Sequence, residues 1–343
     1  MVKGFAFVPA RRLTSGNTAR MMQGMNSKHR WGTALAAALL ILPCVSQANN
    51  SPVASPTVQR PPIVGVAWIS LRTADLEATR KFYTGYLGLE EMPGVKYETD
   101  GGLTRAVFKI NDHQFVQVLP ELKDPKQNRL IDIAFETTSA EQLRAYLAAK
   151  DVKVPDQIES SSSRIGGLST RSFTITDAEG HLIKFVEFAS GKAKVRAADQ
   201  STPDNRVSIH MIHTGFIVHD RPAEDHLFKD VLGFTETWHG GMTDDKVSWI
   251  DMRLPNGKDW LEYMMDYDDS DVRISGIMNH LALGVPSVKD GYDTVVKRGM
   301  NPEKPKIGRD GKWQLNLYSP DLTRVELMEP KPVETPCCSP MLQ

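Results

Sequence analysis

Residues 220–233, DRPAEDHLFKDVLG, repeat the pattern of residues 75–88, DLEATRKFYTGYLG. In both segments an aspartate that can cap a helix stands first, and a glycine that can end the helix stands last. Each segment follows an apolar run and precedes two runs of alternating polarity, which are typical of strands. The sequence therefore contains an internal repeat of one strand, one helix and further strands.

Two weaker copies of this plan fill the gaps between the strong ones. The chain is thus predicted to hold four βαβββ units, at about residues 63–121, 127–190, 209–266 and 278–330. One unit alone would leave a sheet face open to water, so the units are expected to pair. The predicted fold class is α+β, with the four units paired into two domains.

The predicted domain organisation follows from these units and from composition. We expect a Pro/Ser-rich linker at 49–62, a first domain at 63–190, a second linker at 191–208, a second domain at 209–330 and a tail at 331–343. A chain of 343 residues with 41% apolar and 24% charged residues suits two soluble globular domains. A formal net charge of −1 without a basic block argues against a nucleic-acid partner.

Residues 25–48 have the features of a secretory signal peptide. Lys28 and Arg30 precede a short apolar run, and Ser46-Gln47-Ala48 resembles a cleavage site. The protein is therefore expected to be exported, to the periplasm, with no stable membrane span after cleavage. Lipidation at Cys44 is left open. The other cysteines, Cys337 and Cys338, lie in the tail, so the folded body has no disulfide framework.

The repeated units, with an aspartate at the start and Leu-Gly at the end of each strong copy, resemble the vicinal oxygen chelate superfamily. That superfamily includes glyoxalase I, type I extradiol dioxygenases and the bleomycin resistance proteins. The resemblance covers about residues 63–330 and implies cupped sheets around one divalent metal. Carried over by position, it implies four metal ligands from the first and last strands of the last two units: His213, Glu262, His280 and Glu326.

The residues make a physical case of their own. Glu262 lies among Leu, Tyr and Met, and Glu326 lies between Val325 and Leu327, so burial of either carboxylate would be costly without a partner. Two such acids and two strand histidines could share one cation, and imidazole and carboxylate suit Fe²⁺, Mn²⁺, Ni²⁺, Co²⁺ or Zn²⁺. The alternative interpretation has no metal: His213 and His280 would be core histidines with satisfied hydrogen bonds, and Glu262 and Glu326 would lie on an open face of the sheet. The neighbouring His210 and His219 are expected to have surface or supporting roles.

The equivalent positions of the first half are Trp68, Gln117, Asp132 and Lys184. Tryptophan cannot bind a metal, and a lysine would repel one. The first half is therefore predicted to be non-catalytic, a division that extradiol dioxygenases also show.

The reaction stays open between two classes. Three ligands on Fe²⁺ or Mn²⁺ suit a ring-cleaving dioxygenase, whereas four ligands on Ni²⁺, Co²⁺ or Zn²⁺ suit a glyoxalase-like lyase or isomerase. Tyr318 is the candidate donor to a bound oxyanion, and His239 is the candidate proton relay. A third class is a metal-free protein that sequesters a small molecule. The expected partner is a small molecule with adjacent oxygens, and homo-oligomerisation is left open.

Overall fold

The computed structural model describes residues 58–92, 105–165, 168–189, 205–265, 267–268 and 271–342. The predicted signal peptide, most of the linker at 49–62 and residues 191–204 of the second linker lie outside these residues. The chain divides into residues 1–55 and residues 56–343, and every described element belongs to the second unit. No helix among the described residues has the length and hydropathy needed to cross a membrane.

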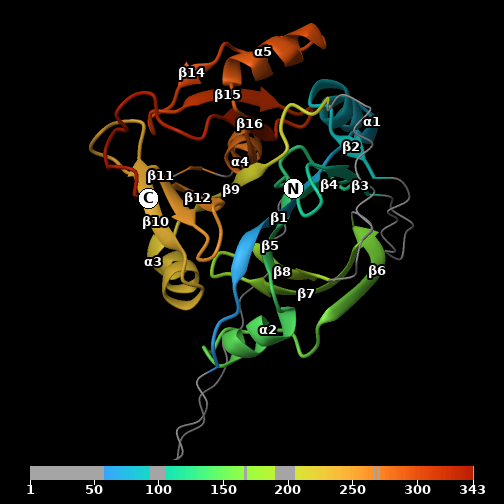
Figure 1. Ribbon diagram of the computed structural model, residues 1–343, viewed down its shortest axis with the longest axis vertical. Coiled ribbons are helices and arrows are strands. Elements are labelled where there is room, and N and C mark those ends of the chain that lie inside the picture. Colours follow the sequence, from blue (N-terminus) through green and yellow to red (C-terminus); the bar gives the residue numbers. More distant parts are fainter. Residues whose placement is uncertain are drawn as a thin grey trace, which may run out of the picture. The chain divides into compact units, whose positions relative to one another are not determined.

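The first half of the described chain forms one eight-stranded sheet with the strand order β2-β3-β4-β1-β5-β8-β7-β6 (Figure 1). Its elements are β1 (Ile63–Arg72), α1 (Leu76–Arg80), a π-helical turn (Lys81–Tyr86), β2 (Glu90–Glu91), β3 (Ala106–Lys109), β4 (Phe115–Leu119), β5 (Leu130–Thr137), α2 (Ala140–Ala148), β6 (Glu159–Ile165), β7 (Leu168–Thr176) and β8 (Leu182–Phe188).

The second half forms another eight-stranded sheet with the equivalent order β10-β11-β12-β9-β13-β16-β15-β14. Its elements are β9 (Met211–Val218), α3 (Arg221–Asp225), a π-helical turn (His226–Val231), β10 (Thr235–Gly240), β11 (Trp249–Arg253), β12 (Trp260–Met265), α4 (Val272–Met278), β13 (His280–Gly284), α5 (Val288–Lys297), β14 (Lys306–Ile307), β15 (Trp313–Tyr318) and β16 (Arg324–Met328). Apart from α4, the two halves match element by element. The predicted α+β fold of four βαβββ units in two cupped sheets is confirmed.

The two strong copies of the repeat begin and end as their sequence predicts. The side chain of Asp75 accepts a hydrogen bond from the backbone of Ala78, and Asp220 does the same for Ala223. Gly88 ends its segment with φ of 71°, and a Cβ there would lie only 2.2 Å from a backbone oxygen. The expectation of one continuous α-helix is wrong, however, because both copies widen into a π-helical turn after five residues.

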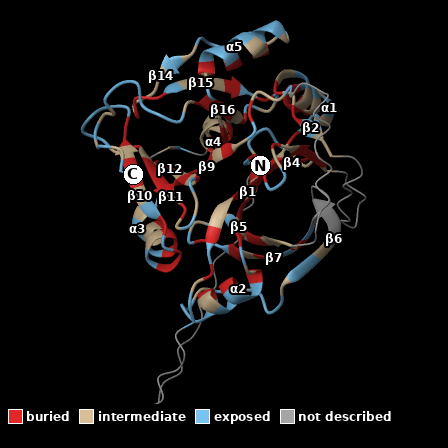
Figure 2. Ribbon diagram, viewed as in Figure 1, coloured by how far each residue is buried: buried red, intermediate tan, exposed pale blue. Residues whose placement is uncertain are grey.

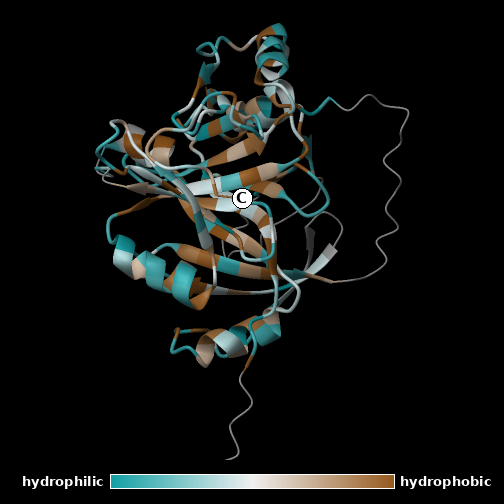
Figure 3. Ribbon diagram, turned by 60° about the vertical axis from the view of Figure 1, so that its left-hand side comes forward, coloured by the Kyte–Doolittle hydropathy of each residue, from teal (hydrophilic) through white to brown (hydrophobic). Residues whose placement is uncertain are grey.

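The hydrophobic core lies between each sheet and its helices and continues from one half to the other (Figure 2). Hydrophobic and hydrophilic residues alternate along the strands, as expected for sheets with two different faces (Figure 3). Phe135 of the first half meets Phe234 of the second edge to face, with ring centroids 5.4 Å apart. The core thus joins the halves as well as filling each of them.

A reciprocal pair of polar side chains also joins the halves where β1 runs near β9. Gln114 and Asp259 occupy equivalent positions just before β4 and β12. Gln114 accepts a hydrogen bond from the backbone of Met211, at 2.8 Å, and Asp259 accepts one from the backbone of Val66, at 2.9 Å. The two side chains also hydrogen-bond to each other, at 3.2 Å. His210, predicted to have a surface or supporting role, binds Asp259 at 2.7 Å.

Candidate metal centre

Strand register brings the four predicted ligands to one face of the second sheet. Ala282 of β13 lies opposite both His213 of β9 and Glu326 of β16. Gly215, two residues after His213, lies opposite both Glu262 and His280. Because side chains directly opposite in a sheet, or two residues apart on a strand, share a face, all four ligands project to the same side.

Donor atoms of His213, His280 and Glu326 lie within 4.8 Å of one another, and Glu262 lies against both histidines. The Nε2 atoms of His213 and His280 are 3.1 Å apart, and Oε2 of Glu262 lies 3.6 Å from the first and 3.0 Å from the second. Oε2 of Glu326 lies 3.6 Å from Nε2 of His213 and 4.0 Å from Nε2 of His280. These separations are close to those of donors that share one cation, since each would lie about 2.0–2.2 Å from the ion.

The protonation states of the two histidines fit metal binding. Nδ1 of His280 lies 2.8 Å from the carbonyl oxygen of Met278 and donates to it, which directs the lone pair of Nε2 to the centre. Burial lowers the pKa of both imidazoles well below the ordinary value, so both are neutral near pH 7. Nδ1 of His213 is buried without a hydrogen-bond partner among the described residues, whereas metal-bound histidines usually have one.

Glu326 carries the clearest electrostatic signal of the site. Its carboxyl group is buried, and burial raises its pKa to about 7 although the nearby Arg324 opposes the shift. Burial likewise raises the pKa of Asp251 well above its ordinary range, and Lys312 opposes that shift. Unprotonated nitrogens and carboxylates this close repel one another unless a cation or a proton separates them. The chemistry of the four donors therefore fits a divalent cation.

Gly215 makes room for one of the histidines. A Cβ at this position would lie 2.1 Å from Cε1 and 2.5 Å from Nδ1 of His280. Only glycine lets the ring lie across the strand at this point. The equivalent position of the first half, by register, holds Ser70.

A cavity of about 450 Å³ adjoins the site and has Glu262, Glu326 and Arg324 in its lining. Glu262 and Glu326 lie at its base, and Tyr318 lines it with 40% of the side chain exposed. The cavity also takes side chains from β10, β11, β14 and β15: Trp238, Trp249, Ile307 and Asn316. Its size suits a small molecule.

The other predicted catalytic residue, His239, does not line this cavity. Its ring binds Glu236 at 2.8 Å, and its backbone binds Ser339 of the tail. Trp238, the residue before it on β10, points into the cavity instead. Neighbouring residues on a strand point to opposite faces, so Trp238 lines the cavity and His239 does not. The predicted proton-relay role of His239 has no support in the structure.

Arg324 is a cavity residue that the sequence analysis missed. One of its guanidinium nitrogens donates to Nε2 of His280 at 2.8 Å and lies 4.0 Å from Oε2 of Glu262. Arg324 precedes Glu326 by two residues on β16, so alternation alone places both side chains on one face. Its charge lies beside the point where the four ligands converge.

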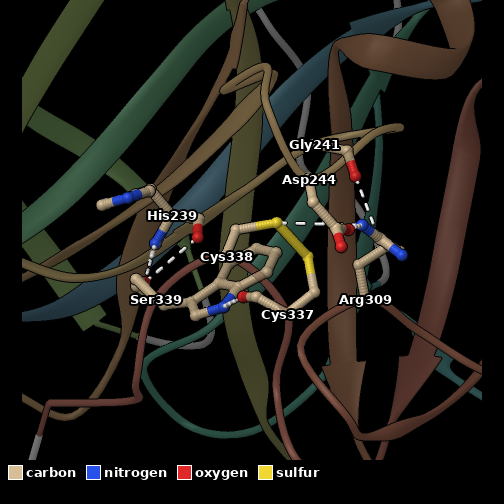
Figure 4. Close-up of a disulfide and its surroundings, with 8 residues drawn as sticks. His239, Gly241, Asp244, Arg309, Cys337, Cys338 and Ser339 are labelled. Carbon is tan, nitrogen blue, oxygen red and sulfur yellow. Dashed lines mark hydrogen bonds and ion pairs between the residues drawn. A yellow bond between two sulfur atoms is a disulfide. The ribbon is translucent and has the colours of Figure 1, made fainter.

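The tail packs against the rim of the same cavity (Figure 4). Cys337 and Cys338, for which the sequence suggested no partner, form a disulfide with each other. The carbonyl of Cys337 accepts a hydrogen bond from the indole of Trp238 at 3.2 Å. Arg309, which lines the cavity, binds Asp244 and the carbonyl of Gly241. The predicted tail thus packs behind two residues that line the cavity, Trp238 and Arg309.

The equivalent positions of the first half hold a different network. By register, Trp68, Gln117, Asp132 and Lys184 correspond to the four ligand positions. Asp132 accepts hydrogen bonds from the indole of Trp68 at 3.0 Å and from Ser70 at 2.8 Å. Asp132 is thus held by neighbouring donors, and a tryptophan and a lysine stand where the second half has a histidine and a glutamate. The non-catalytic role of this half stays a prediction.

Comparison with known proteins agrees with this architecture. The sequence profile of the Glyoxalase/Bleomycin resistance protein/Dioxygenase superfamily matches residues 65–185. Residues 65–185 thus match this superfamily, in agreement with the predicted resemblance to the vicinal oxygen chelate group. The profile covers the half without the four ligands. No curated protein matches the chain in sequence.

Solved structures with the same fold belong to two kinds of enzyme. The Mn(II)-bound glyoxalase from Novosphingobium aromaticivorans is 18% identical with a TM-score of 0.56, over 78% of this chain and 83% of that one. Homoprotocatechuate 2,3-dioxygenase from Brevibacterium fuscum is 16% identical with a TM-score of 0.56, over 80% and 82%. A 2,3-dioxygenase from a Pseudomonas species is 16% identical with a TM-score of 0.58, over 81% and 97%. At these identities the likeness shows the fold alone.

Proposed function

We propose that the protein is a divalent-metal-dependent enzyme that acts on a small molecule with two adjacent oxygens, by glyoxalase-like lyase or isomerase chemistry. The observation that supports this choice is the fourth donor. Oε2 of Glu262 lies 3.0 Å from Nε2 of His280 and 3.6 Å from Nε2 of His213, so a second carboxylate borders the group formed by the two imidazoles and Glu326. A four-ligand set leaves two positions of an octahedral ion for the substrate oxygens.

The residues of the cavity divide the chemical work. A bound divalent cation would act as a Lewis acid on the substrate oxygens. Glu262 is the more exposed of the two carboxylates, with 13% of its side chain accessible against 5% for Glu326. We therefore assign Glu262 the transfer of a proton at the substrate carbon. Arg324 and the hydroxyl of Tyr318 face the same cavity and would stabilise negative charge on the substrate oxygens.

Ring cleavage by a dioxygenase is the second candidate. The dioxygenases with the same fold favour it, as does a core of two histidines and Glu326 whose donor atoms lie within 4.8 Å of one another. The two candidate functions differ in whether Glu262 binds the metal. If it does not bind the metal, three ligands remain, as ring cleavage requires.

Metal analysis combined with two activity assays separates these functions. For the proposed function we expect bound Mn²⁺, Ni²⁺, Co²⁺ or Zn²⁺, conversion of an α-hydroxycarbonyl or thiohemiacetal substrate without oxygen, and lower metal content in Glu262→Gln. Oxygen uptake with a catechol, together with full metal content in Glu262→Gln, would instead identify the dioxygenase. A metal-free protein that binds its ligand tightly would contradict both and identify a sequestering protein.

Export to the periplasm is part of the proposal and rests on residues 25–48, with their basic start, apolar run and small-residue end. Fractionation of cells that produce the full chain tests it. The expected result is a periplasmic protein whose N-terminus is Asn49. A cytoplasmic protein that retains Met25 would contradict the proposal.

A further inference from the structure

A second group of ligand-type side chains lies where the two halves meet, on the other face of the second sheet. Asp177 and His181 belong to the hairpin turn between β7 and β8 of the first half, and Glu224 belongs to α3 of the second. One ligand atom from each of the three lies within 4.8 Å of the others. None of the three lines the cavity over His213.

Strand alternation separates this group from the first centre. His181 packs edge to face on Phe216, with ring centroids 4.6 Å apart. Phe216 is three residues after His213 on β9, so its side chain points to the opposite face of the sheet from the first centre. The two groups of ligand-type residues are therefore distinct sites.

The turn holds its two members in fixed positions. Oδ1 of Asp177 accepts hydrogen bonds from the backbone of Glu179 at 3.0 Å and of His181 at 2.8 Å. Oδ2 of Asp177 pairs with Nδ1 of the His181 ring at 2.8 Å. A separation of 2.8 Å also suits two donors that share one cation, with Nδ1 of His181 unprotonated.

Glu224 lacks any such support. Its side chain is fully buried, and neither carboxylate oxygen has a hydrogen-bond partner among the described residues. Burial raises its pKa to about 8, the charges of Asp177 and Glu179 add to the shift, and the backbone N–H of Glu179 opposes it. Protonation would not satisfy the group, because the new O–H would still need an acceptor.

The neighbouring charged residues are already engaged. Arg221, on the same helix, pairs with Asp225 and with Glu236. The carboxylate of Glu179 accepts hydrogen bonds from the backbone of His219 and Asp220. The cluster is thus rich in acid, and the cations described near it do not neutralise Glu224.

We propose that Asp177, His181 and Glu224 bind a second divalent cation, which links the two halves of the protein. One imidazole and two carboxylates suit Zn²⁺ or Mn²⁺. Two donors at 2.0–2.2 Å from one ion lie about 3 to 4.4 Å apart, so atoms up to 4.8 Å apart would have to close by at most about 2 Å. The cation supplies the partner that the buried carboxylate of Glu224 lacks.

Metal stoichiometry in four proteins tests the proposal, with the mature chain stripped of metal and then titrated with Zn²⁺ or Mn²⁺. We expect two ions per chain in the wild type, one in Glu224→Gln, one in His213→Ala and none in the double variant. Glutamine has the size of glutamate and removes a buried acid, so Glu224→Gln is expected to fold.

The same titrations include the result that would overturn the proposal. If Glu224 is only a buried neutral carboxyl, Glu224→Gln binds as many ions as the wild type, whether that number is one or two. Unfolding temperature gives a second measurement. Added metal should still raise the unfolding temperature of His213→Ala. If metal no longer raises it in the double variant with Glu224→Gln, the remaining ion belongs to this site. If metal does not raise the unfolding temperature of His213→Ala, the proposal of a second ion is wrong.

Discussion

Replacement of Glu326 by glutamine should stabilise the metal-free protein and weaken metal binding. Burial raises the pKa of Glu326 from the ordinary 4.5 to about 7. The folded state therefore favours the protonated carboxyl, and the stability it contributes is complete below pH 4.5 and lost as the pH rises through 7. The shift of 2.5 pKa units corresponds to a loss of roughly 3 kcal/mol by pH 8.

Urea unfolding of both proteins in EDTA between pH 5 and pH 9 measures this effect. Other buried acids also titrate, so the quantity of interest is the difference between Glu326→Gln and the wild type. We expect a difference that grows from pH 5 to pH 8 by about 3 kcal/mol in favour of the variant. Saturating Mn²⁺ or Zn²⁺ should reverse the order, because a cation replaces the proton only in the wild type.

A difference that does not change with pH would refute the reasoning, because it would mean that the carboxyl is not held in its protonated form by burial. A metal-induced stabilisation of equal size in both proteins would separately refute the assignment of Glu326 as a ligand.

Two further predictions concern the supporting residues. Gly215→Ala should displace the ring of His280 and weaken metal binding by about tenfold or more while circular dichroism stays unchanged, and equal affinity in a metal titration would contradict the close contact. Asp259→Ala should lower the free energy of unfolding by about 2 kcal/mol, since the buried backbone N–H of Val66 loses its acceptor, and an unchanged urea midpoint would show that water replaces it.

The sequence was most informative about the repeat. Aspartate at the start and glycine at the end marked the same helical segment in both halves, and alternation marked the strands that follow each segment. Equivalence between units then placed four ligand positions on adjacent strands, where the structure brings their side chains together. That these side chains bind a metal stays a prediction, which the Glu262→Gln experiment tests.

Other features could not be predicted because they depend on contacts between distant segments. The partner of Arg324 is the ring of His280, 44 residues away, and no local pattern reports that contact. The group of Asp177, His181 and Glu224 forms only when a turn of one half meets a helix of the other. The position of the tail depends on hydrogen bonds to Trp238 and His239, about 100 residues earlier.

The network in the first half limits how this protein could evolve a second catalytic centre. Asp132 is held by Trp68 and Ser70, the side-chain amide of Gln117 is held by Arg105 at 2.7 Å, and Lys184 lies 3.6 Å from a glutamate. Replacing Trp68 by its counterpart removes a donor from the buried Asp132, and replacing Asp132 by its counterpart removes the acceptor of Trp68 and Ser70, each at a cost in stability. Single mutations therefore pass through weakened intermediates, and selection would keep this half as a scaffold while the opposite cavity remains free to change its substrate.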